Sequence, residues 1–323
     1  GLSAAWRLHR EGAKEIVVVD AGEEPGGNSR AGRNPTSRFP WGAHYLRAPT
    51  QDHRSLEVFL EEVGLIRGRD AEGHLDFDTR AVCAAPQERI YEGGLWAEGL
   101  FPPPRSRSDP ALAQFKRFDE QVSDLAKRKG LDGRRAFAIP VELSSRDPEL
   151  VALDTLPFAD WLTSEGYTDP TLLWYLEYAC RDDYGCTLKT ASAWAGLHYF
   201  AARHSSPDRD VVLAWPEGNA RLVELLAKGI DVEGRSLCFR LSPGKASASS
   251  EAWIYTPDPE RVTRVVAKHV IYAGPQFVLG RLLPKAPAHS QAFTYAPWLV
   301  ANVTFDKQPG GIGAPLAWDN VFY

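Results

Sequence analysis

The first residues of the chain have the types and spacing of a nucleotide-binding site. Gly1 opens a helical pattern, and Asp20 ends the β-branched run EIVVVD. In a βαβ unit that binds a dinucleotide, a glycine lets the backbone approach the pyrophosphate at a helix N-terminus, and an acid about 20 residues on binds the ribose hydroxyls. The alternative is an ordinary α/β strand with a solvated acid at its end. Nucleotide binding is favoured because glycine, helix, strand and acid occur together in this order.

A glycine-dense loop follows the acid. It starts at Ala21 and continues through PGGNSR, which contains Gly26, Gly27, Asn28 and Arg30. Glycines free backbone N–H groups to point at an anion, and a nearby arginine adds charge-assisted hydrogen bonds. The composition therefore predicts contacts to a diphosphate, with a flexible surface loop as the alternative.

Two adjacent acids in the middle of the chain form a second candidate group. Asp182 and Asp183 lie in CRDDYGC, which we expect to be a turn between two aromatic helices. Paired acids on such a turn could hold a cationic substrate or accept a proton. In the alternative interpretation one acid caps the next helix, and Arg181 neutralises the other.

Other catalytic signatures are missing from the sequence. It contains no G-x-S-x-G, H-E-x-x-H or G-x-x-x-x-G-K-[ST] pattern, which gives no support to a hydrolase, a zinc protease or a P-loop protein. The four cysteines lack the paired spacing of a metal site, so no metal is predicted.

Composition excludes further classes of function. The formal net charge is -5 over 323 residues, and lysines and arginines are scattered, so no nucleic-acid partner is expected. No run reaches the roughly 18 apolar residues of a membrane-spanning helix. We therefore expect no membrane segment and a cytoplasmic protein.

The elements that would position these residues follow from periodicity. A helix over 2–8 ends at Gly12, and the strand over 15–20 should be buried on both faces, as central parallel strands are. Further helices are predicted over 52–63, 111–129, 155–165, 171–179 and 276–283. Strands are predicted over 211–215 and 237–241, in a hairpin of 252–255 with 262–266, and as two aromatic strands in the last section.

The order of helix, VVVDA, GGNS and a strand ending in WGAH resembles a known superfamily. It comprises the FAD-dependent amine oxidases, protoporphyrinogen oxidases and phytoene desaturases. The resemblance implies that Asp20 binds the adenosine ribose and that the Gly-Gly loop lies against the pyrophosphate. It also places Gly42, Ala43 and His44 beside the flavin ring.

The same resemblance extends to later segments. The strand over 237–241 would run past the adenine, starting at Leu237, and HVIYAGP would reach the flavin with Ala273, Gly274 and Pro275. His44 and Tyr45 then become candidates for catalysis beside the ring, together with Asp182 and Asp183. A packed, hydrogen-bonded histidine is the alternative for His44. In the loop that leads into the next helix, Asn219 stands where the superfamily has a second glycine, which leaves the local turn geometry open.

The implied fold is α/β: a doubly wound, Rossmann-like FAD-binding domain built from discontinuous segments, with an inserted mixed α+β substrate domain. We expect the FAD-binding domain in 1–50 and 209–283 and the substrate domain in 51–208 and 284–323. We also expect the first strand, the first two glycines of the fingerprint and the last nucleotide segment of the superfamily to be missing, so that the chain is truncated at both ends.

The implied activity is oxidation of a C–N or C–C bond of a small organic substrate by hydride transfer to FAD, with oxygen or another electron acceptor. Two alternatives remain. Rab GDP-dissociation inhibitors share the architecture and bind prenylated proteins without flavin chemistry. An NAD(P)-binding dehydrogenase uses the same fingerprint.

Overall fold

The structure is a computed structural model, and it describes residues 1–50, 52–84, 87–103, 109–204, 208, 210–244, 249–307 and 310–323. The chain divides into two compact units. Unit 1 comprises Gly1–Tyr45 and Trp215–Thr304, and unit 2 comprises Leu46–Ala214 and Phe305–Tyr323. Residues 51 and 209, where two expected domain boundaries fall, lie outside the described residues.

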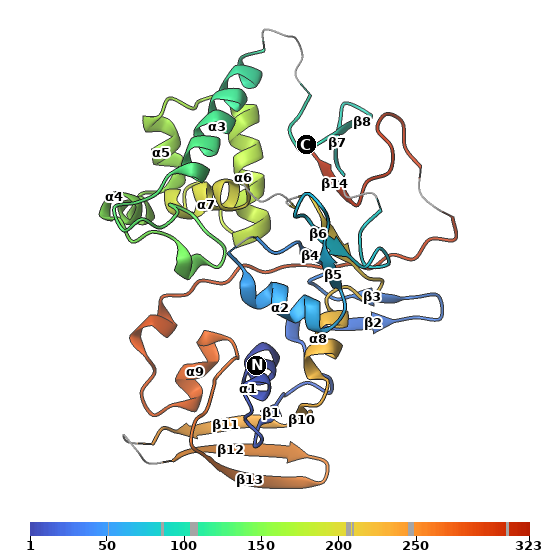
Figure 1. The fold of residues 1–323 in the computed structure, drawn as a ribbon, viewed down its shortest axis with the longest axis vertical. Helices are drawn as coiled ribbons and strands as arrows, with labels where there is room; N and C mark the ends of the chain where they lie inside the picture. The colour runs from blue at the N-terminus through green and yellow to red at the C-terminus, as the bar shows by residue number, and fades with distance from the viewer. Residues whose placement is uncertain are drawn as a thin grey trace. The chain divides into compact units, whose positions relative to one another are not determined.

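Unit 1 contains short strands and three helices among its described residues (Figure 1). Its helices are α1 (Leu2–Arg10), α8 (Ala220–Ala227) and α9 (Gln276–Leu282), with single 3₁₀ turns η1 (Gly27–Ser29) and η4 (Ala288–Gln291). Its strands are β1 (Val17–Val19), β2 (Ala31–Arg33), β3 (Arg38–Pro40), β10 (Asp231–Glu233), β11 (Leu237–Ser242), β12 (Ser250–Pro257) and β13 (Glu260–Ala267).

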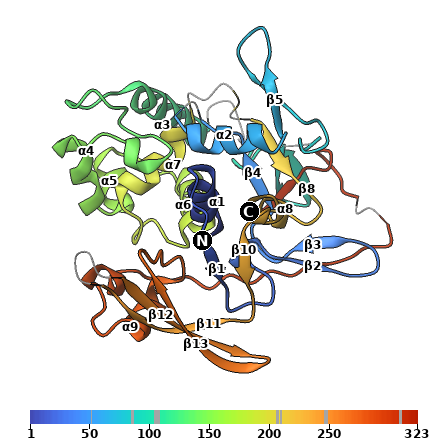
Figure 2. The ribbon, with the colours of Figure 1, turned by 60° about the horizontal axis from the view of Figure 1, so that its bottom comes forward.

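The strand β1 pairs in parallel with β10, with Val18 opposite Val232. Helix α1 packs against β1 and α8 (Figure 2). The expectation that this strand is buried on both faces was wrong, because Val17 is 52% exposed. Within the described residues β1 has one strand neighbour, β10, and a parallel strand is enclosed only where neighbours and helices cover it on every side.

A separate antiparallel sheet follows in the order β11-β12-β13. The predicted hairpin is confirmed, with Ile254 opposite Thr263. Leu241, Ala252 and Leu282 form the buried centre between this sheet and α9. The strand that directly follows α8 is β10 rather than the predicted one over 237–241, which instead begins the antiparallel sheet.

The first of the two aromatic strands expected near the end of the chain is not formed. Residues 292–305 have no regular secondary structure, and Trp298 and Leu299 are 65% and 95% exposed. Aromatic and β-branched residues favour a strand only when a neighbouring strand completes their hydrogen bonds and packing. The second expected strand exists as β14 (Asp319–Phe322), which pairs in parallel with β7 of unit 2.

Unit 2 combines a helical body with small sheets. The helices are α2 (Arg54–Glu62), α3 (Pro110–Lys127), α4 (Pro148–Ala152), α5 (Phe158–Ser164), α6 (Pro170–Tyr184) and α7 (Ala193–His204), with 3₁₀ turns η2 (Val141–Leu143) and η3 (Leu153–Thr155). The strands are β4 (Tyr45–Arg47), which starts at the unit boundary, β5 (Ile66–Arg69), β6 (Leu75–Phe77), β7 (Glu88–Glu92), β8 (Leu95–Glu98), β9 (Val212–Ala214) and β14.

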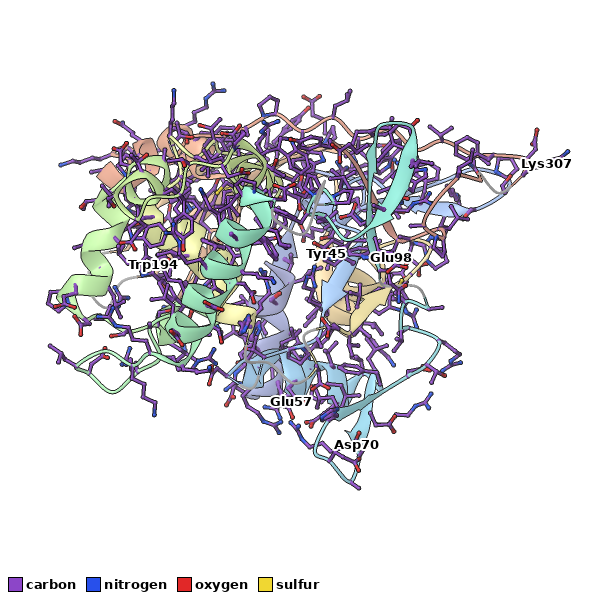
Figure 3. All side chains as sticks on the ribbon, turned by 90° about the horizontal axis from the view of Figure 1, so that it is seen from above. Tyr45, Glu57, Asp70, Glu98, Trp194 and Lys307 are labelled. Carbon is purple, nitrogen blue, oxygen red and sulfur yellow. The ribbon has the colours of Figure 1, made fainter. Side chains whose placement is uncertain are left out.

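The core of unit 2 lies where α3, α5, α6 and α7 meet. Helix α6 begins with Asp169, whose carboxylate accepts from Thr171 N (2.9 Å), and ends at Gly185 with φ +64°. Gly196 in α7 allows the closest approach in this core, because a Cβ there would lie 2.3 Å from the ring of Phe158. Trp194, labelled in Figure 3, stacks on His198 with ring centroids 4.8 Å apart.

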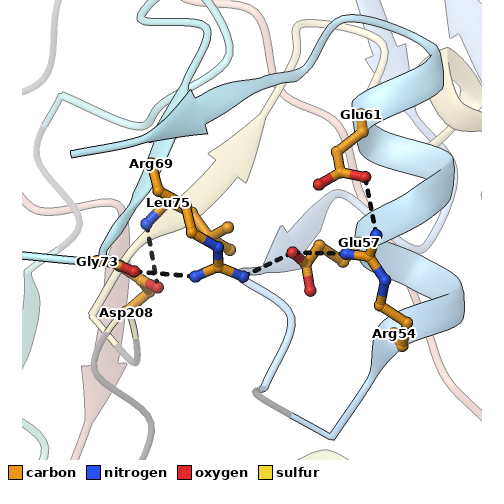
Figure 4. A network of polar contacts seen from close by, with 7 residues as sticks. All are labelled: Arg54, Glu57, Glu61, Arg69, Gly73, Leu75 and Asp208. Atoms are coloured by element: carbon orange, nitrogen blue, oxygen red, sulfur yellow. Dashed lines mark hydrogen bonds and ion pairs between the residues drawn. The ribbon is translucent and has the colours of Figure 1, made fainter.

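A charged network ties α2 to the β5–β6 hairpin (Figure 4). The buried Glu57 accepts from Arg69 Nη2 at 2.6 Å and pairs with Arg54 at 2.8 Å. Arg69 Nη1 also donates to Gly73 O at 2.9 Å, which closes the hairpin turn. A buried carboxylate costs little when it is paired and hydrogen-bonded in this way, so the network fixes the hairpin on the helix.

Asp78, just after β6, has a strongly stabilised carboxylate. Arg80 donates to it from both its side chain (2.8 Å) and its backbone (3.1 Å), and Arg67 Nη2 lies 2.7 Å away. These contacts lower the pKa of Asp78 to about 2. Since an unfolded aspartate titrates near pH ~3.9, the ionised group contributes stability above that pH and loses it as the pH falls towards 2.

We predict that Asp78→Asn destabilises the fold near neutral pH and that this effect shrinks as the pH is lowered from about 5 to 2, since protonation removes the same interactions from the wild type. Urea unfolding of both proteins across this range measures the difference in free energy of unfolding. A difference that stays constant with pH would contradict the account.

Among the described residues, no helix is both long and apolar enough to cross a membrane.

Candidate functional site

The start of α1 is the meeting point of three segments of unit 1 that lie far apart in the sequence. A Cβ on Gly1 would lie 3.8 Å from Ala273 Cβ and 4.0 Å from Val18 Cγ1. A helix N-terminus presents free N–H groups and the positive end of the helix dipole, which together favour an anion. The predicted glycine, strand and late turn therefore meet at this helix start.

Asp20 follows β1 and is held on both sides by backbone hydrogen bonds. Its N–H donates to Glu233 O at 3.0 Å, and its carbonyl accepts from Ser236 N at 2.9 Å. One carboxylate oxygen, Oδ1, accepts from Gly22 N at 2.8 Å. A carboxylate has about four acceptor positions, so Asp20 keeps capacity for ligand hydroxyls. Leu237, expected beside the adenine, directly follows Ser236 and is half exposed.

The Gly-Gly loop adopts backbone conformations that other residues rarely take. Gly26 has φ +129° and Gly27 has φ +54°. A Cβ on Gly26 would lie 3.2 Å from Val223 Cγ2, so the loop packs closely on α8.

Arg30 leads out of this loop and turns back over it. Its Nε donates to Gly27 O at 3.2 Å. Its Nη1 lies 3.6 Å from the point that a Cβ on Gly22 would occupy, and Asp20 Oδ1 lies 3.1 Å from the same point. Beside it is an open hollow of about 320 Å³ lined by Glu23, Glu24, Arg30, Ala31 and Trp41. The guanidinium and the acid thus both approach Gly22.

The WGAH turn is bound directly to the Gly-Gly loop. Ala43 N donates to Asn28 O at 2.9 Å, and a Cβ on Gly42 would lie 2.6 Å from the same oxygen. Glycine is therefore required at position 42 for this approach.

Asn219 supports the same turn from the other side. Its N–H donates to Ala43 O at 3.0 Å and its Nδ2 donates to Tyr45 O at 2.9 Å. The preceding Gly218 has φ +60°, and a Cβ there would lie 2.6 Å from Pro40 Cβ. Asn219 Oδ1 is buried and has no hydrogen-bond partner in the described part of the chain. Asparagine in place of a second glycine thus leaves the turn formed and ties it to β4.

His44 and Tyr45 are adjacent at the start of β4, and their rings form an edge-to-face pair with centroids 5.1 Å apart. His44 Nδ1 lies 3.2 Å from Gly42 O, and the residue is exposed. The histidine is therefore hydrogen-bonded within its own turn without being packed in a core.

The late turn of residues 273–275 is shaped by Tyr272, whose hydroxyl donates to Pro275 O at 2.7 Å. A Cβ on Gly274 would lie 2.7 Å from that hydroxyl oxygen, so glycine is needed there. This turn contacts Gly1, whereas the WGAH turn contacts Asn28, Gly218 and Asn219. The structure thus joins the two turns expected near the flavin to different parts of unit 1.

Asp182 and Asp183 are not on a turn, as expected, but in the last helical turn of α6. The helix continues past 179 because Gly185, in the left-handed conformation, is the residue that ends it. Arg181 pairs with Glu177 at 2.9 Å rather than with either acid. Neither acid caps α7, since Ala195 N donates to Ser192 Oγ. Asp183 instead pairs with Arg203 at 3.6 Å.

Several polar side chains of unit 2 interact electrostatically with these acids. Burial raises the pKa of Glu88, Arg47 at 3.4 Å lowers it, and the nearby Asp319 and Asp182 raise it again. Burial also raises the pKa of the Tyr199 hydroxyl, and Asp183 adds to that shift. Sequence reasoning missed Arg47 and Glu88, because they come from two separate segments and neither belongs to a motif.

Metal chemistry gains no support from the described part of the chain, where no group of three or more His, Cys, Asp or Glu side chains could hold a metal ion.

Comparison with known proteins extends these observations. Residues 1–63 match the family described as an NAD(P)-binding Rossmann-like domain. No curated protein matches the chain in sequence. A putrescine oxidase solved with bound putrescine is 17% identical, with a TM-score of 0.62 over 90% of this chain and 59% of its own. A fatty acid isomerase from P. acnes that produces CLA is 14% identical, with a TM-score of 0.60 over 90% of this chain and 60% of its own.

The chain thus spans about three fifths of the length of these two structures. At such identities the likeness concerns the fold, and it covers nine tenths of the chain. The resemblance noted in the sequence is supported at that level: residues 1–63 match a Rossmann-like family, and the chain shares the fold of the putrescine oxidase and fatty acid isomerase structures.

Proposed function

We propose that this protein is an FAD-dependent oxidoreductase of the amine oxidase type. It would oxidise a C–N or C–C bond of a small organic substrate and pass the electrons to oxygen or another acceptor. The observation that carries the proposal is the convergence of Gly1, Val18 and Ala273 at the start of α1, next to an acid on the end of β1. A dinucleotide needs this combination of a close backbone approach, a helix N-terminus and a ribose acceptor.

The residues present fit such a cofactor. Gly26 and Gly27 have positive φ values, a backbone conformation that lets a glycine loop turn its N–H groups towards an anion. Asp20 has one oxygen fixed by Gly22 and retains further acceptor positions. The buried Asn219 Oδ1, beside the WGAH turn, is an acceptor that a bound donor group could satisfy.

In this proposal unit 1 holds the cofactor. Asp20 binds the adenosine ribose beside Ala21 and Leu237, and Gly26, Gly27, Asn28 and Arg30 hold the pyrophosphate. Gly42, Ala43 and His44, together with Ala273, Gly274 and Pro275, bound the flavin ring. When bound, flavin supplies hydride acceptance and onward electron transfer. The domain assignment of 1–50 with 209–283 remains part of the proposal.

Two further acids are proposed to act on the substrate. Asp182 and Asp183 end α6 beside Glu88, Arg47 and Tyr199. Carboxylates in such a setting can orient a cationic group or accept a proton, and burial raises the pKa of Glu88. His44 and Tyr45 are proposed to orient the substrate or hold a proton on the cofactor side.

The absorbance spectrum of the full-length protein tests the assignment of FAD. We expect bands near about 370 and 450 nm in the protein as purified or after incubation with FAD, which is the property of oxidised flavin. A full-length protein that stays colourless after incubation would overturn the proposal. Binding of NAD(P)H by such a protein would then identify the dehydrogenase alternative.

Asp20→Ala should weaken FAD binding by removing charge-assisted hydrogen bonds to the ribose, a loss on the order of 2 to 3 kcal/mol, or about 30- to 150-fold in Kd. Fluorescence titration of FAD into the apoprotein measures the change. Asp231→Ala is the matched control, because Asp231 lies at the opposite end of the same parallel strand pair, facing Val17. Equal FAD affinity of the Asp20 variant and the wild type would show that Asp20 only ends a strand.

His44→Ala should slow flavin reduction by substrate more than it weakens FAD binding, because the imidazole is proposed to face the substrate rather than the pyrophosphate. Anaerobic stopped-flow reduction gives the rate, and the same titration gives the affinity. His74→Ala, an exposed histidine in the β5–β6 turn of unit 2, is the control. A reduction rate equal to that of the wild type would remove His44 from the reaction.

A further inference from the structure

The turn between β10 and β11 does more than connect two strands. We propose that residues 233–236 act as a clamp that orients Asp20 towards the ribose of a bound dinucleotide, with Gly234 and Arg235 as the positioning residues. The inference rests on the proposed nucleotide site, and it assigns a role to a turn that lies outside the glycine-rich fingerprint.

The clamp holds the Asp20 loop by three backbone hydrogen bonds. Glu233 O accepts from Asp20 N at 3.0 Å, and Ser236 N donates to Asp20 O at 2.9 Å. Between them, Arg235 N donates to Gly22 O at 2.6 Å. The N–H and C=O groups of Asp20 and the C=O group of Gly22 are therefore hydrogen-bonded to one short turn.

The orientation of the carboxylate follows from the position of Gly22. Gly22 N donates to Asp20 Oδ1 at 2.8 Å, so this N–H selects which way the carboxylate faces. The carbonyl oxygen of Gly22 accepts from Arg235 N, so Gly22 is held through both its N–H and its C=O group. A shift of the turn would move Gly22 and rotate the carboxylate away from the ribose hydroxyls.

Gly234 sets how closely the turn approaches. A Cβ at this position would lie 2.5 Å from Glu23 O and 3.2 Å from Gly22 O, both backbone atoms. No side chain fits between the turn and the loop. The distance between them is therefore set by the absence of a side chain at position 234.

Arg235 shows that the turn is held under strain. Its φ of +50° is the one positive value among the described residues other than glycine. Its guanidinium pairs with Glu23, but both side chains are more than half exposed, and an exposed ion pair contributes little. The strain is thus maintained by the backbone bonds to the Asp20 loop and by Ser236, whose buried Oγ lies 3.2 Å from Thr256 Oγ1 on β12.

The test compares the binding of ADP and 2′-deoxyADP by calorimetry in the full-length apoprotein. An oriented carboxylate should make the wild type bind ADP about tenfold more tightly than 2′-deoxyADP, since one charge-assisted hydrogen bond is lost in the deoxy compound. Gly234→Ala should bring this ratio close to one. A purely structural defect would instead weaken both nucleotides equally and keep the ratio.

Two further variants sharpen the test. Gly22→Ala, whose Cβ would lie 3.1 Å from Asp20 Oδ1, should also remove the preference and serves if Gly234→Ala fails to fold. Gly229→Ala places a side chain at φ +77° with no atom within 4 Å, and it controls for backbone strain alone.

The outcomes separate the two levels of inference. Wild-type protein that binds neither FAD nor ADP overturns the proposed nucleotide site itself. A second outcome overturns the clamp and leaves the nucleotide site standing. In it, the wild type binds both FAD and ADP and discriminates against 2′-deoxyADP, and Gly234→Ala and Gly22→Ala discriminate equally well.

Discussion

The parallel pairing of β1 with β10 is the interaction on which the candidate site depends. It continues beyond the strands into the hydrogen bonds that hold Asp20 between Glu233 and Ser236. Because β1 and β10 are more than two hundred residues apart in the chain, this one ladder brings the start of the sequence to its later segments. The Gly-Gly loop, the WGAH turn and the loop at Gly218 are joined to one another by further backbone contacts.

Local signals were enough to predict much of this arrangement. The helix after Gly1, the helix with an aspartate cap and proline at its start, and the hairpin of β12 with β13 all follow from capping residues and periodicity. These signals act over a few residues and do not depend on distant partners. The Rossmann-like start was predictable for the same reason, since its spacing is short.

Features that depend on distant partners were not predictable. The strand at 15–20 reads as fully buried, yet burial depends on neighbours that its own residues do not specify. The aromatic segment before Thr304 has the composition of a strand but pairs with no other strand within the described residues. Asp182 and Asp183 seemed to lie on a turn because the apolar pattern of the predicted helix ends at Ala179, whereas α6 continues to Tyr184 and ends at Gly185. Arg47, Glu88 and Tyr199 meet only through tertiary packing.

The way Asp20 and the WGAH turn are held has a consequence for how such proteins diverge. Peptide N–H and C=O groups are common to nearly every residue type, so bonds between them survive almost any substitution that leaves the glycines in place. A site built in this manner constrains a few positions and leaves the rest free to drift. At 17% identity, the fold of this chain still aligns with that of a putrescine oxidase over 90% of its residues. A site held in this way depends on the path of the backbone more than on the identity of its side chains.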